Sequence, residues 1–590
     1  MARNKYNVDE TLETEFNAKH LIRSFQYIKR YKKLFFGAFF FSTVSILCGL
    51  VMPLFTADAI DVMIPNRDVR GLIIAGISLI VIVVVQALCN RFRSRCSAIA
   101  GQEIIRDIRR DLFVHLQELP FDYFDSRPHG KILVRVINYV NSVSDFLTNG
   151  IVNILLQILS LIFIAIFMIS LHPQLSLVVF AGLPVFAIYI FAIKQKQRRA
   201  WQLQANKSSN FTAYLAESIN GERVTQSFAR EDVNYGINQD LAMDARKAYM
   251  KAVTINHSIW PLTMIISKAV YYLIYIIGVI YMRDTIAVGL LVAMTSYANR
   301  FWGPIQQLST YYNQLINTVS YLERIFQLMD EPVLVNDPEG ATALPPIEGT
   351  VDFENVIFEY EKDRPILKNV SFHVASGESI ALVGPTGAGK STIINLISRF
   401  YNIKSGAVKI DGYDIANATL RSIRSQMGIM LQDTFIFSGT IMENIRYGRL
   451  DATDEECIAA AKQVFADDFI SKMPNGYYTE INERGDMLSA GQRQLLSFAR
   501  TLLSDPKILI LDEATSSIDT NTELLVQEGI KQLLKNRTSF VVAHRLSTIK
   551  DCDRIMFIND GVIAESGSHD ELMAQKGLYY HLYTSQLTNE

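Results

Sequence analysis

Hydrophobic residues gather in the first half of the chain in six long runs. The runs cover residues 34–56, 71–90, 147–170, 175–193, 259–281 and 285–307. Each is close to the roughly 20 residues with which an α-helix crosses a bilayer. Buried helices of a soluble core are the alternative, but their apolar runs are usually only about 10–14 residues long. The pattern therefore predicts six membrane-spanning helices within residues 34–329.

Two charged segments, residues 91–146 and 194–258, separate these runs and are rich in arginine and lysine. The positive-inside rule assigns both segments to the cytoplasm, so six spans leave both termini on the cytoplasmic side. Their helical pattern predicts extensions of the membrane helices. Each segment turns near its middle, at residues 119–130 and 217–222. Such a tip either contacts a soluble domain or is a solvated hairpin turn.

The N-terminal segment, residues 1–33, is polar and charged. Within it, Leu21, Ile22, Phe25 and Ile28 recur at helical spacing, with lysine and arginine on the other faces. This pattern predicts an amphipathic helix over residues 16–31 that lies on the inner membrane surface.

Two cations interrupt the last two apolar runs, Lys268 in the fifth and Arg300 in the sixth. A charge at the centre of a span costs roughly 2.5–3.5 kcal/mol on insertion scales and usually faces a cavity or a partner. Asn299, Arg300 and Trp302 are therefore candidates for a transport path. The alternative is that Arg300 lies near the cytoplasmic end of its span, among the lipid headgroups.

The composition changes after residue 329. Proline, glycine and acidic residues predict a linker over residues 330–349. Over residues 350–590 strand patterns alternate with helical ones, which predicts an α/β domain. With 20% charged residues and a net charge of −2, nothing indicates a nucleic-acid partner. The five cysteines form no C-x-x-C pair, so neither a zinc site nor a disulfide framework is expected.

A glycine-rich motif opens the chemistry of this second domain. It comprises Gly384, Pro385, Thr386, Gly387, Ala388, Gly389, Lys390, Ser391 and Thr392. An apolar strand precedes it and an apolar helix follows, the context of a phosphate loop of the form G-x-x-x-x-G-K-[ST]. The backbone amides would cradle phosphates, Lys390 would reach the β- and γ-phosphates, and Ser391 would ligate Mg²⁺. The motif predicts a nucleoside triphosphate site.

Two further motifs fit that site. The apolar run Ile508–Leu511 is followed by Asp512 and Glu513, a strand end that would hold Mg²⁺ and polarise the attacking water. Upstream, Ser489, Gly491 and Gln492 open a predicted helix whose N-terminus suits phosphate. By themselves these three residues could equally form a capping turn.

With these motifs the chain resembles an ATP-binding cassette (ABC) exporter of the multidrug-resistance-like type IV class. The expected fold is an α-helical six-span transmembrane domain fused to an α/β P-loop nucleotide-binding domain. The resemblance implies ATP and Mg²⁺ as cofactors. By this resemblance Tyr360 would stack on adenine, Gln432 would approach the metal ion, and residues 488–492 would be the family signature. Glu513 would be the catalytic base, and His544 would contact the γ-phosphate. The tips at residues 121–130 and 217–228 resemble coupling helices.

The resemblance also implies a second half-transporter subunit, because the signature of one nucleotide domain completes the ATP site of the other. Ala490 stands where the family usually has glycine. A degenerate signature beside a complete catalytic set resembles the active-site-bearing half of a heterodimeric exporter, which favours a heterodimer, and a homodimer stays open. The expected function is ATP-driven export of amphipathic compounds such as drugs or lipids; a peptide exporter and a homodimeric lipid flippase are the alternatives. We expect a multi-pass protein of a bacterial plasma membrane.

Overall fold

The computed structural model describes residues 18–125, 129–281, 286–361, 363–430, 434–482, 485, 487–512, 520–542 and 549–587. The chain divides into two compact units. The helical unit comprises Met1–Leu116 and His129–Glu331, and the α/β unit comprises Gln117–Pro128 and Pro332–Glu590. The short segment 117–128 thus belongs to the α/β unit, although it lies between membrane helices in the sequence.

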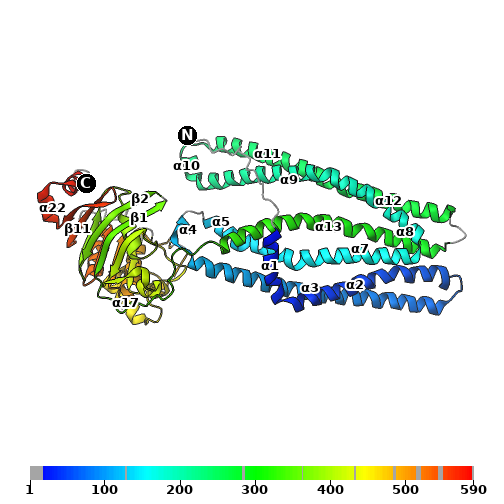
Figure 1. Ribbon diagram of the computed structural model, residues 1–590, viewed down its shortest axis with the longest axis horizontal. Helices are drawn as coiled ribbons and strands as arrows, with labels where there is room; N and C mark the ends of the chain where they lie inside the picture. Colours follow the sequence, from blue (N-terminus) through cyan, green and yellow to red (C-terminus); the bar gives the residue numbers. More distant parts are fainter. Residues whose placement is uncertain are drawn as a thin grey trace. The chain divides into compact units, whose positions relative to one another are not determined.

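The helical unit consists of long helices joined by short ones (Figure 1). They are α1 (Ala18–Arg30), α2 (Lys32–Asp58), α3 (Val69–Glu118), α5 (His129–Val134), α6 (Val140–Asp145), α7 (Ile151–Leu171), α8 (Pro173–Phe180), α9 (Gly182–Asn220), α10 (Glu222–Ser227), α11 (Glu231–His257), α12 (Ile259–Ile276) and α13 (Val288–Met329). Single π-helical turns continue α2 over Ala59–Met63 and α12 over Ile277–Tyr281.

Five helical stretches in the described part of the chain are long and apolar enough to cross a membrane. They are Lys32–Met63, Val69–Glu118, Ile132–Leu171, Pro173–Asn220 and Glu231–Ile280. The sixth expected span, residues 285–307, falls on α13, which is not among the five. Polar residues such as Asn299, Arg300 and Gln306 lower its apolar character. The structure therefore supports a multi-span helical domain, and the count of six remains a prediction.

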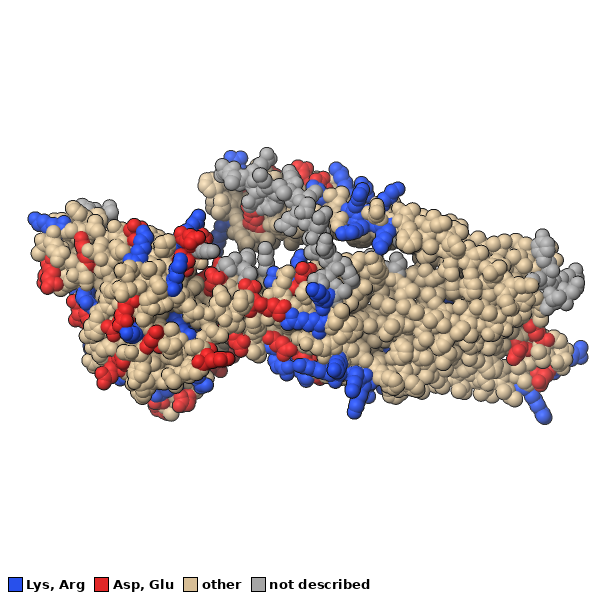
Figure 2. All heavy atoms as spheres, viewed as in Figure 1, with Lys and Arg blue, Asp and Glu red and all other residues tan. Residues whose placement is uncertain are grey.

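The surface of the helical unit is apolar over a wide zone. Ile73, Ile77 and Ile80 of α3 are each more than half exposed. Figure 2 shows a broad area without charged side chains over these helices, with lysine, arginine and acidic residues gathered beyond it. An apolar patch of this extent is unfavourable in water and suits the hydrocarbon of a bilayer.

The interior of the helical unit centres on α13, which packs against α2, α7 and α12. Tyr297 of α13 is fully buried, and its hydroxyl donates to the carbonyl of Leu50 on α2. Trp302 is also buried, and its ring packs against Gly182, where a Cβ atom would lie only 2.9 Å from the indole. These contacts fix which face of α13 points into the protein.

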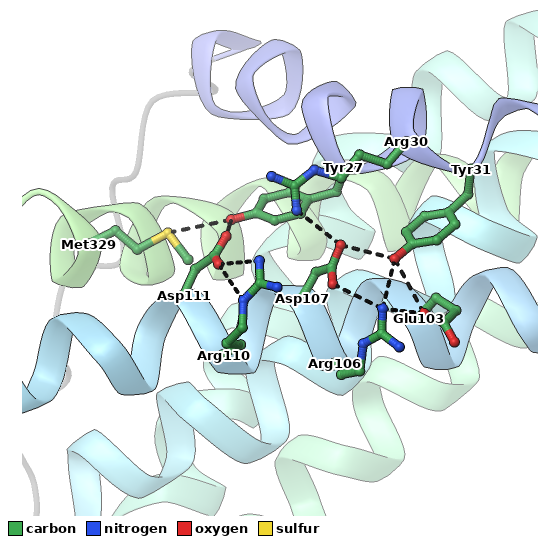
Figure 3. Close-up of polar contacts among 9 residues, drawn as sticks. All are labelled: Tyr27, Arg30, Tyr31, Glu103, Arg106, Asp107, Arg110, Asp111 and Met329. Atoms are coloured by element: carbon green, nitrogen blue, oxygen red, sulfur yellow. Dashed lines mark hydrogen bonds and ion pairs between the residues drawn. The ribbon is translucent and has the colours of Figure 1, made fainter.

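The predicted amphipathic N-terminal helix is α1, and its polar face binds the protein. Tyr27 and Arg30 of α1, with Tyr31 just after it, meet Asp107 and Asp111 of α3 (Figure 3). We call these five residues the N-terminal clasp. Arg30 and Tyr31 each donate to the Asp107 carboxylate at 3.0 Å. Tyr27 donates to Asp111 at 3.1 Å; its burial, with the Asp111 charge, raises the pKa of the hydroxyl to about 12, so it remains a donor at neutral pH.

Arg23 on the same helix reaches the end of α13. It forms an ion pair with Asp330 at 2.6 Å and lies over the ring of Phe326 at 4.3 Å. The apolar side chains Ile22 and Phe25 face away from the protein, at 68% and 43% exposure. This arrangement is compatible with a helix at the membrane surface, with its apolar residues toward lipid.

The α/β unit contains two main sheets. One has the order β2-β1-β4-β5 and the other β12-β11-β3-β10-β9-β6. The strands are β1 (Val351–Glu361), β2 (Arg364–Val374), β3 (Ser379–Val383), β4 (Ser405–Ile410), β5 (Tyr413–Asp414), β6 (Met427–Met430), β7 (Gly439–Thr440), β8 (Glu480–Ile481), β9 (Ile508–Asp512), β10 (Thr538–Val542), β11 (Arg554–Asn559) and β12 (Val562–Gly567).

The α/β unit also contains helices, of which Figure 1 labels α4, α17 and α22. They are α4 (Phe121–Asp125), α14 (Lys390–Ile397), α15 (Leu420–Arg424), α16 (Ile441–Arg446), α17 (Asp454–Gln463), α18 (Asp467–Ile470), α19 (Ala490–Leu503), α20 (Thr520–Leu534), α22 (His569–Gln575) and α23 (Leu578–Leu587). In the larger sheet, β11, β3, β10, β9 and β6 are parallel, and β3 and β10 are buried throughout. Continuous apolar strands of this kind are typical of a parallel sheet covered on both faces.

Candidate nucleotide site and membrane cavity

The glycine-rich motif forms the turn between β3 and α14. Gly384 has a φ of 140°, and a Cβ atom there would lie 2.1 Å from the carbonyl oxygen of Ile558. Gly389 has a φ of 111° and would bring a Cβ atom to 2.8 Å from Leu367. Only glycine meets both demands. Pro385, Thr386 and Gly387 are exposed at the tip of the turn, and Ala388, Lys390 and Thr392 are buried at its base.

Lys390 opens α14 and folds back over the loop. Its ammonium donates to the carbonyls of Gly384 at 2.8 Å and Pro385 at 2.9 Å. Burial lowers the pKa of this ammonium, and the nearby Asp512 carboxylate partly offsets the effect. Lys390 thus lies where a phosphate oxygen could replace the two carbonyls, and Ser391 beside it is exposed.

Tyr360, the residue expected to stack on adenine, lies beside the phosphate loop. Its hydroxyl donates to Thr392 Oγ1 at 3.3 Å, and its ring is 44% exposed. The ring of Tyr401 meets it edge-on with centroids 5.0 Å apart. The structure therefore brings the expected adenine platform and the start of α14 together.

Three more expected site residues follow strands that end at this same edge of the sheet. Val542 of β10 is level with Leu382 of β3 on one side and with Asp512 of β9 on the other, and Leu511 pairs with Met430 of β6. The chain beyond these strands leads to Gln432, Glu513 and His544, which lie outside the described residues. Ligands of open α/β sheets bind beyond the carboxyl ends of parallel strands, the position this edge provides.

The expected metal ligands are the Ser391 hydroxyl, the Asp512 carboxylate and the Gln432 amide. All three are hard oxygen donors, the type that Mg²⁺ accepts when it is held by a few side chains and substrate phosphates. Among the residues that the structure describes, no group of three or more histidines, cysteines, aspartates or glutamates is arranged to hold a metal. The donor set thus fits a magnesium ion that arrives with a nucleotide.

The expected signature, Ser489 with Gly491 and Gln492, starts helix α19. Ser489 Oγ accepts from the Gln492 amide at 3.2 Å, and Gln492 Oε1 accepts from the Ser489 amide at 3.0 Å. This reciprocal pair is a capping box. Between the described residues no hydrogen bond or ion pair joins the signature to the phosphate loop. Within one chain, the contacts of this segment are therefore those of a helix cap.

The first predicted tip is α4, and it packs within the α/β unit. The rings of Phe121 and Phe400 lie 4.4 Å apart between centroids. Tyr401 donates its hydroxyl to Asp125 Oδ2 at 3.1 Å, and the same ring meets Tyr360. A side-chain path therefore runs from the tip between two membrane helices to the expected adenine platform.

A polar cavity of about 370 Å³ lies in the helical unit between α2, α3, α7 and α13. Arg300 lines it and donates to the carbonyl of Gly49 at 2.5 Å. Asn299 and Arg300 are both exposed in the single chain, but only Arg300 lines the cavity. Trp302 is buried in the core and is not part of the lining.

Arg300 lies deep within its helix. It is twelve residues from the first residue of α13, Val288, which corresponds to about 18 Å along the helix axis. The hydrocarbon core of a bilayer is about 30 Å thick. This depth favours a position near the middle of the span over one among the cytoplasmic headgroups.

Sequence reasoning missed two sets of residues. No sequence motif points to Tyr401, because a single tyrosine in a loop carries none. The glutamines Gln86 and Gln157 were not singled out either, although both interrupt apolar runs and now line the cavity with Arg300. Polar amides inside predicted spans were the available clue to them.

Comparison with known proteins identifies the family. Residues 35–305 match the ABC transporter transmembrane region and residues 367–516 match the ABC transporter domain. An uncharacterized ABC transporter ATP-binding protein of Bacillus subtilis, YknV, is 42% identical over 590 residues, covering 98% of this chain and 97% of the relative.

Two further similarities extend this result. A fatty acid ABC transporter ATP-binding/permease protein of Mycobacterium bovis is 36% identical over 491 residues, covering 83% of this chain and 78% of the relative. The structure of a bacterial Atm1-family ABC exporter with ATP bound has a TM-score of 0.80 at 28% identity, covering 94% of this chain and 98% of that one. The chain therefore belongs to the ABC transporter family and is an exporter half-transporter, in which a helical membrane domain is fused to the ATP-binding domain of a transport ATPase.

Proposed function

We propose that ATP binding and hydrolysis in the α/β unit drive alternating access of the membrane helices through the tip α4. The observation that carries this proposal is the path from Asp125 through Tyr401 to Tyr360. A change in the position of Tyr360 on nucleotide binding would be transmitted through Tyr401 to α4. Because α4 connects α3 to the helices that follow it, its displacement would act on both of these membrane-spanning segments.

The expected site residues take the following roles in this proposal. Lys390 leaves its two carbonyl acceptors for the β- and γ-phosphates, and Tyr360 stacks on the base. Ser391, Asp512 and Gln432 hold Mg²⁺, which shields the phosphate charge when bound. Glu513 accepts a proton from the attacking water, and His544 contacts the γ-phosphate.

The proposal includes a second subunit, since ABC exporters act as dimers. Ser489 and Ala490 are exposed in the single chain, as a signature that meets a partner's nucleotide would be. Ala490 adds a methyl group where the family usually has glycine, which favours a heterodimer whose second ATP site is weaker. A homodimer is the competing assembly.

The transported compound in this proposal is amphipathic, a drug or a lipid. The apolar surface of the helical unit and the polar cavity inside it together suit a molecule with an apolar body and a polar head. The relative from Mycobacterium bovis, named for fatty acids, is in keeping with that class. We place the protein in a bacterial plasma membrane, with six spans and both termini in the cytoplasm.

The test is ATP hydrolysis and substrate export in lipid vesicles, measured for the chain expressed alone and for the chain co-expressed with a second half-transporter. We expect Glu513→Gln to remove most hydrolysis, at least about 100-fold, while ATP still binds, because only the base is lost. Lys390→Ala should weaken ATP binding itself, because phosphate contacts are lost. Export should fail in both variants.

The outcomes separate the parts of the proposal. Hydrolysis that persists in Glu513→Gln would assign the base to another residue. Export that persists in Lys390→Ala would break the link between the two units. Robust, export-coupled hydrolysis by a self-dimer would exclude the heterodimer, whereas activity that requires a second chain would exclude the homodimer.

A further inference from the structure

The cavity between α2, α3, α7 and α13 has a wall of neutral hydrogen-bonding groups around one cation. The polar residues beside Arg300 are Ser45, Gln86, Gln157, Ser160, Gln306 and Gln307. Gln86 donates to the Ser45 carbonyl at 3.3 Å. Within the described part of the chain, the side-chain amides of Gln157, Gln306 and Gln307 have no protein partner. A membrane cavity therefore offers several amides and one guanidinium to whatever enters it.

Arg300 has no acidic neighbour in this wall. None of the residues that line the cavity is an aspartate or a glutamate. The first acids met along the lining helices are Asp58 at the end of α2, Glu103 on α3 and Glu323 on α13. An arginine side chain has five N–H donors. The carbonyl of Gly49 is the single acceptor found for it among the described residues. Its positive charge is thus not neutralised within the wall.

The lack of a carboxylate partner does not by itself make an arginine a ligand site, as Arg500 in the α/β unit shows. Arg500 also lacks an ion pair among the described residues, but all three of its guanidinium nitrogens donate, two of them to Asn444 and one to the carbonyl of Phe435. The rings of Phe437 and Tyr447 cover it at 5.8 and 5.5 Å. Arg500 is enclosed by protein, whereas Arg300 opens onto a cavity.

We propose that the Arg300 cavity binds the oxyanion head of an apolar-chain amphiphile, a carboxylate or a phosphate. The proposal rests on the exporter function and names the class of compound carried. A guanidinium binds planar and tetrahedral oxyanions through paired hydrogen bonds, and the surrounding amides supply further donors. At about 370 Å³ the cavity is near the small end of ligand sites and takes a head group rather than a long chain.

The test is equilibrium binding of palmitate to the full-length protein in zwitterionic nanodiscs without ATP. Methyl palmitate and the cation palmitoylcholine serve as matched ligands with the same chain. We expect palmitate to bind more tightly than both, and Arg300→Gln to weaken palmitate by about 10- to 100-fold with little effect on the ester. Arg300→Lys should retain part of the affinity, because it keeps the charge but not the fork.

Lys268→Gln is the matched control. Lys268 is a cation on α12, thirteen residues from Tyr281, or about 20 Å along the helix, and its ammonium lies 5.3 Å from the centre of the Tyr271 ring, outside the cavity wall. We expect this variant to leave palmitate affinity and basal ATP hydrolysis unchanged.

Two results would overturn the proposal. One is equal affinity of the wild type for palmitate and its methyl ester. The other is an equal loss of affinity for both ligands in a monodisperse Arg300→Gln preparation. Because binding is measured without ATP, either result leaves the exporter function standing. If the wild-type protein did not hydrolyse ATP, or if its hydrolysis did not depend on Glu513, that result would count against the exporter function and not against the cavity.

Discussion

The N-terminal clasp and the Arg300 cavity place charged side chains in the same helical unit and satisfy them in opposite ways. In the clasp, Asp107 is 3% exposed and accepts from Arg30 and Tyr31, each at 3.0 Å. In the cavity, Arg300 donates to one backbone carbonyl, and no acid is among the residues that line the cavity. The clasp is complete by itself, and the cavity is complete only with a ligand.

This difference separates a structural charge from a functional one. A buried charge with its counter-charge holds elements together, and removal of either partner is costly. A charge left without one inside a membrane domain is costly to keep, and such residues usually mark a substrate pathway. We therefore assign the clasp to the attachment of α1 and the cavity to recognition.

The largest effect on palmitate affinity is expected when a carboxylate is introduced into the cavity. A Cβ atom on Gly49 would lie 3.4 Å from Arg300 Nη1 and 3.2 Å from Gln86 Nε2. Gly49→Asp would therefore place an acid beside the guanidinium and convert the cavity into a second clasp. We expect palmitate affinity to fall by about 100-fold or more, because the internal carboxylate competes for the same donors. The measurement is palmitate binding in nanodiscs.

Gly49→Ala is the control for this change, since it adds the Cβ atom without the charge. Arg300 and Gln86 contact the new atom with the flexible ends of their side chains, so the alanine needs only a shift of a few tenths of an ångström. A smaller loss in Gly49→Ala than in Gly49→Asp supports the electrostatic account. Equal losses would show that space, and not charge, governs the cavity.

A substitution in the clasp should lower the thermal stability of the protein and leave ligand binding unchanged. Asp107→Asn keeps the shape of the side chain but removes the charge that accepts from Arg30 and Tyr31. We expect the thermal unfolding midpoint in detergent to fall by roughly 2–4 °C, with palmitate affinity unchanged. Glu103→Gln, a more exposed acid of α3 near Tyr31, should cause a smaller fall. A larger fall in the control would remove Asp107 from the centre of the clasp.

The smallest effect is expected at the exposed pair of Arg23 and Asp330, whose side chains are 41% and 52% exposed. The hydrogen bond from Arg23 holds the pKa of the Asp330 carboxyl below its usual value. The stabilisation is therefore present above the ordinary pKa of the carboxyl and is lost as the pH falls through the lowered one.

We expect Arg23→Gln to lower the unfolding midpoint by at most about 1–2 °C near neutral pH, because exposed pairs are screened by water. The difference from the wild type should vanish as the pH falls through the lowered pKa of Asp330, because the carboxyl is then protonated in both proteins. A difference that persists unchanged in acid would assign the effect to the packing of Arg23 on Phe326.

The helical unit could be predicted from the sequence in outline but not in its contacts. Apolar runs of about 20 residues identify membrane helices because the bilayer demands that length. The same pattern gives α1 its helical period, but not the finding that its polar face docks on Asp107 while Ile22 faces outward. Which face meets protein depends on residues about 75 positions away in the sequence, and no local pattern contains them.

The α/β unit was more open to prediction, because phosphate binding requires a continuous local motif. Gly384 and Gly389 occupy left-handed backbone conformations that the loop needs, and Lys390 follows them directly. The assembly of Tyr360 with Thr392, or of Asp125 with Tyr401, depends instead on how distant elements pack. Glu513, His544 and Gln432 follow strands that share an edge, and their roles remain predictions.

The sequence by itself determined the two-part construction of this protein, the family to which it belongs and the loop that binds ATP. These properties follow from segment length, from period and from residues adjacent in the chain. Only the tertiary structure decided that Arg300 faces a cavity without an acid, that Trp302 does not, and that the tip α4 contacts Tyr401. Each of these depends on the rotation of a helix about its own axis, which packing against distant segments fixes and composition does not.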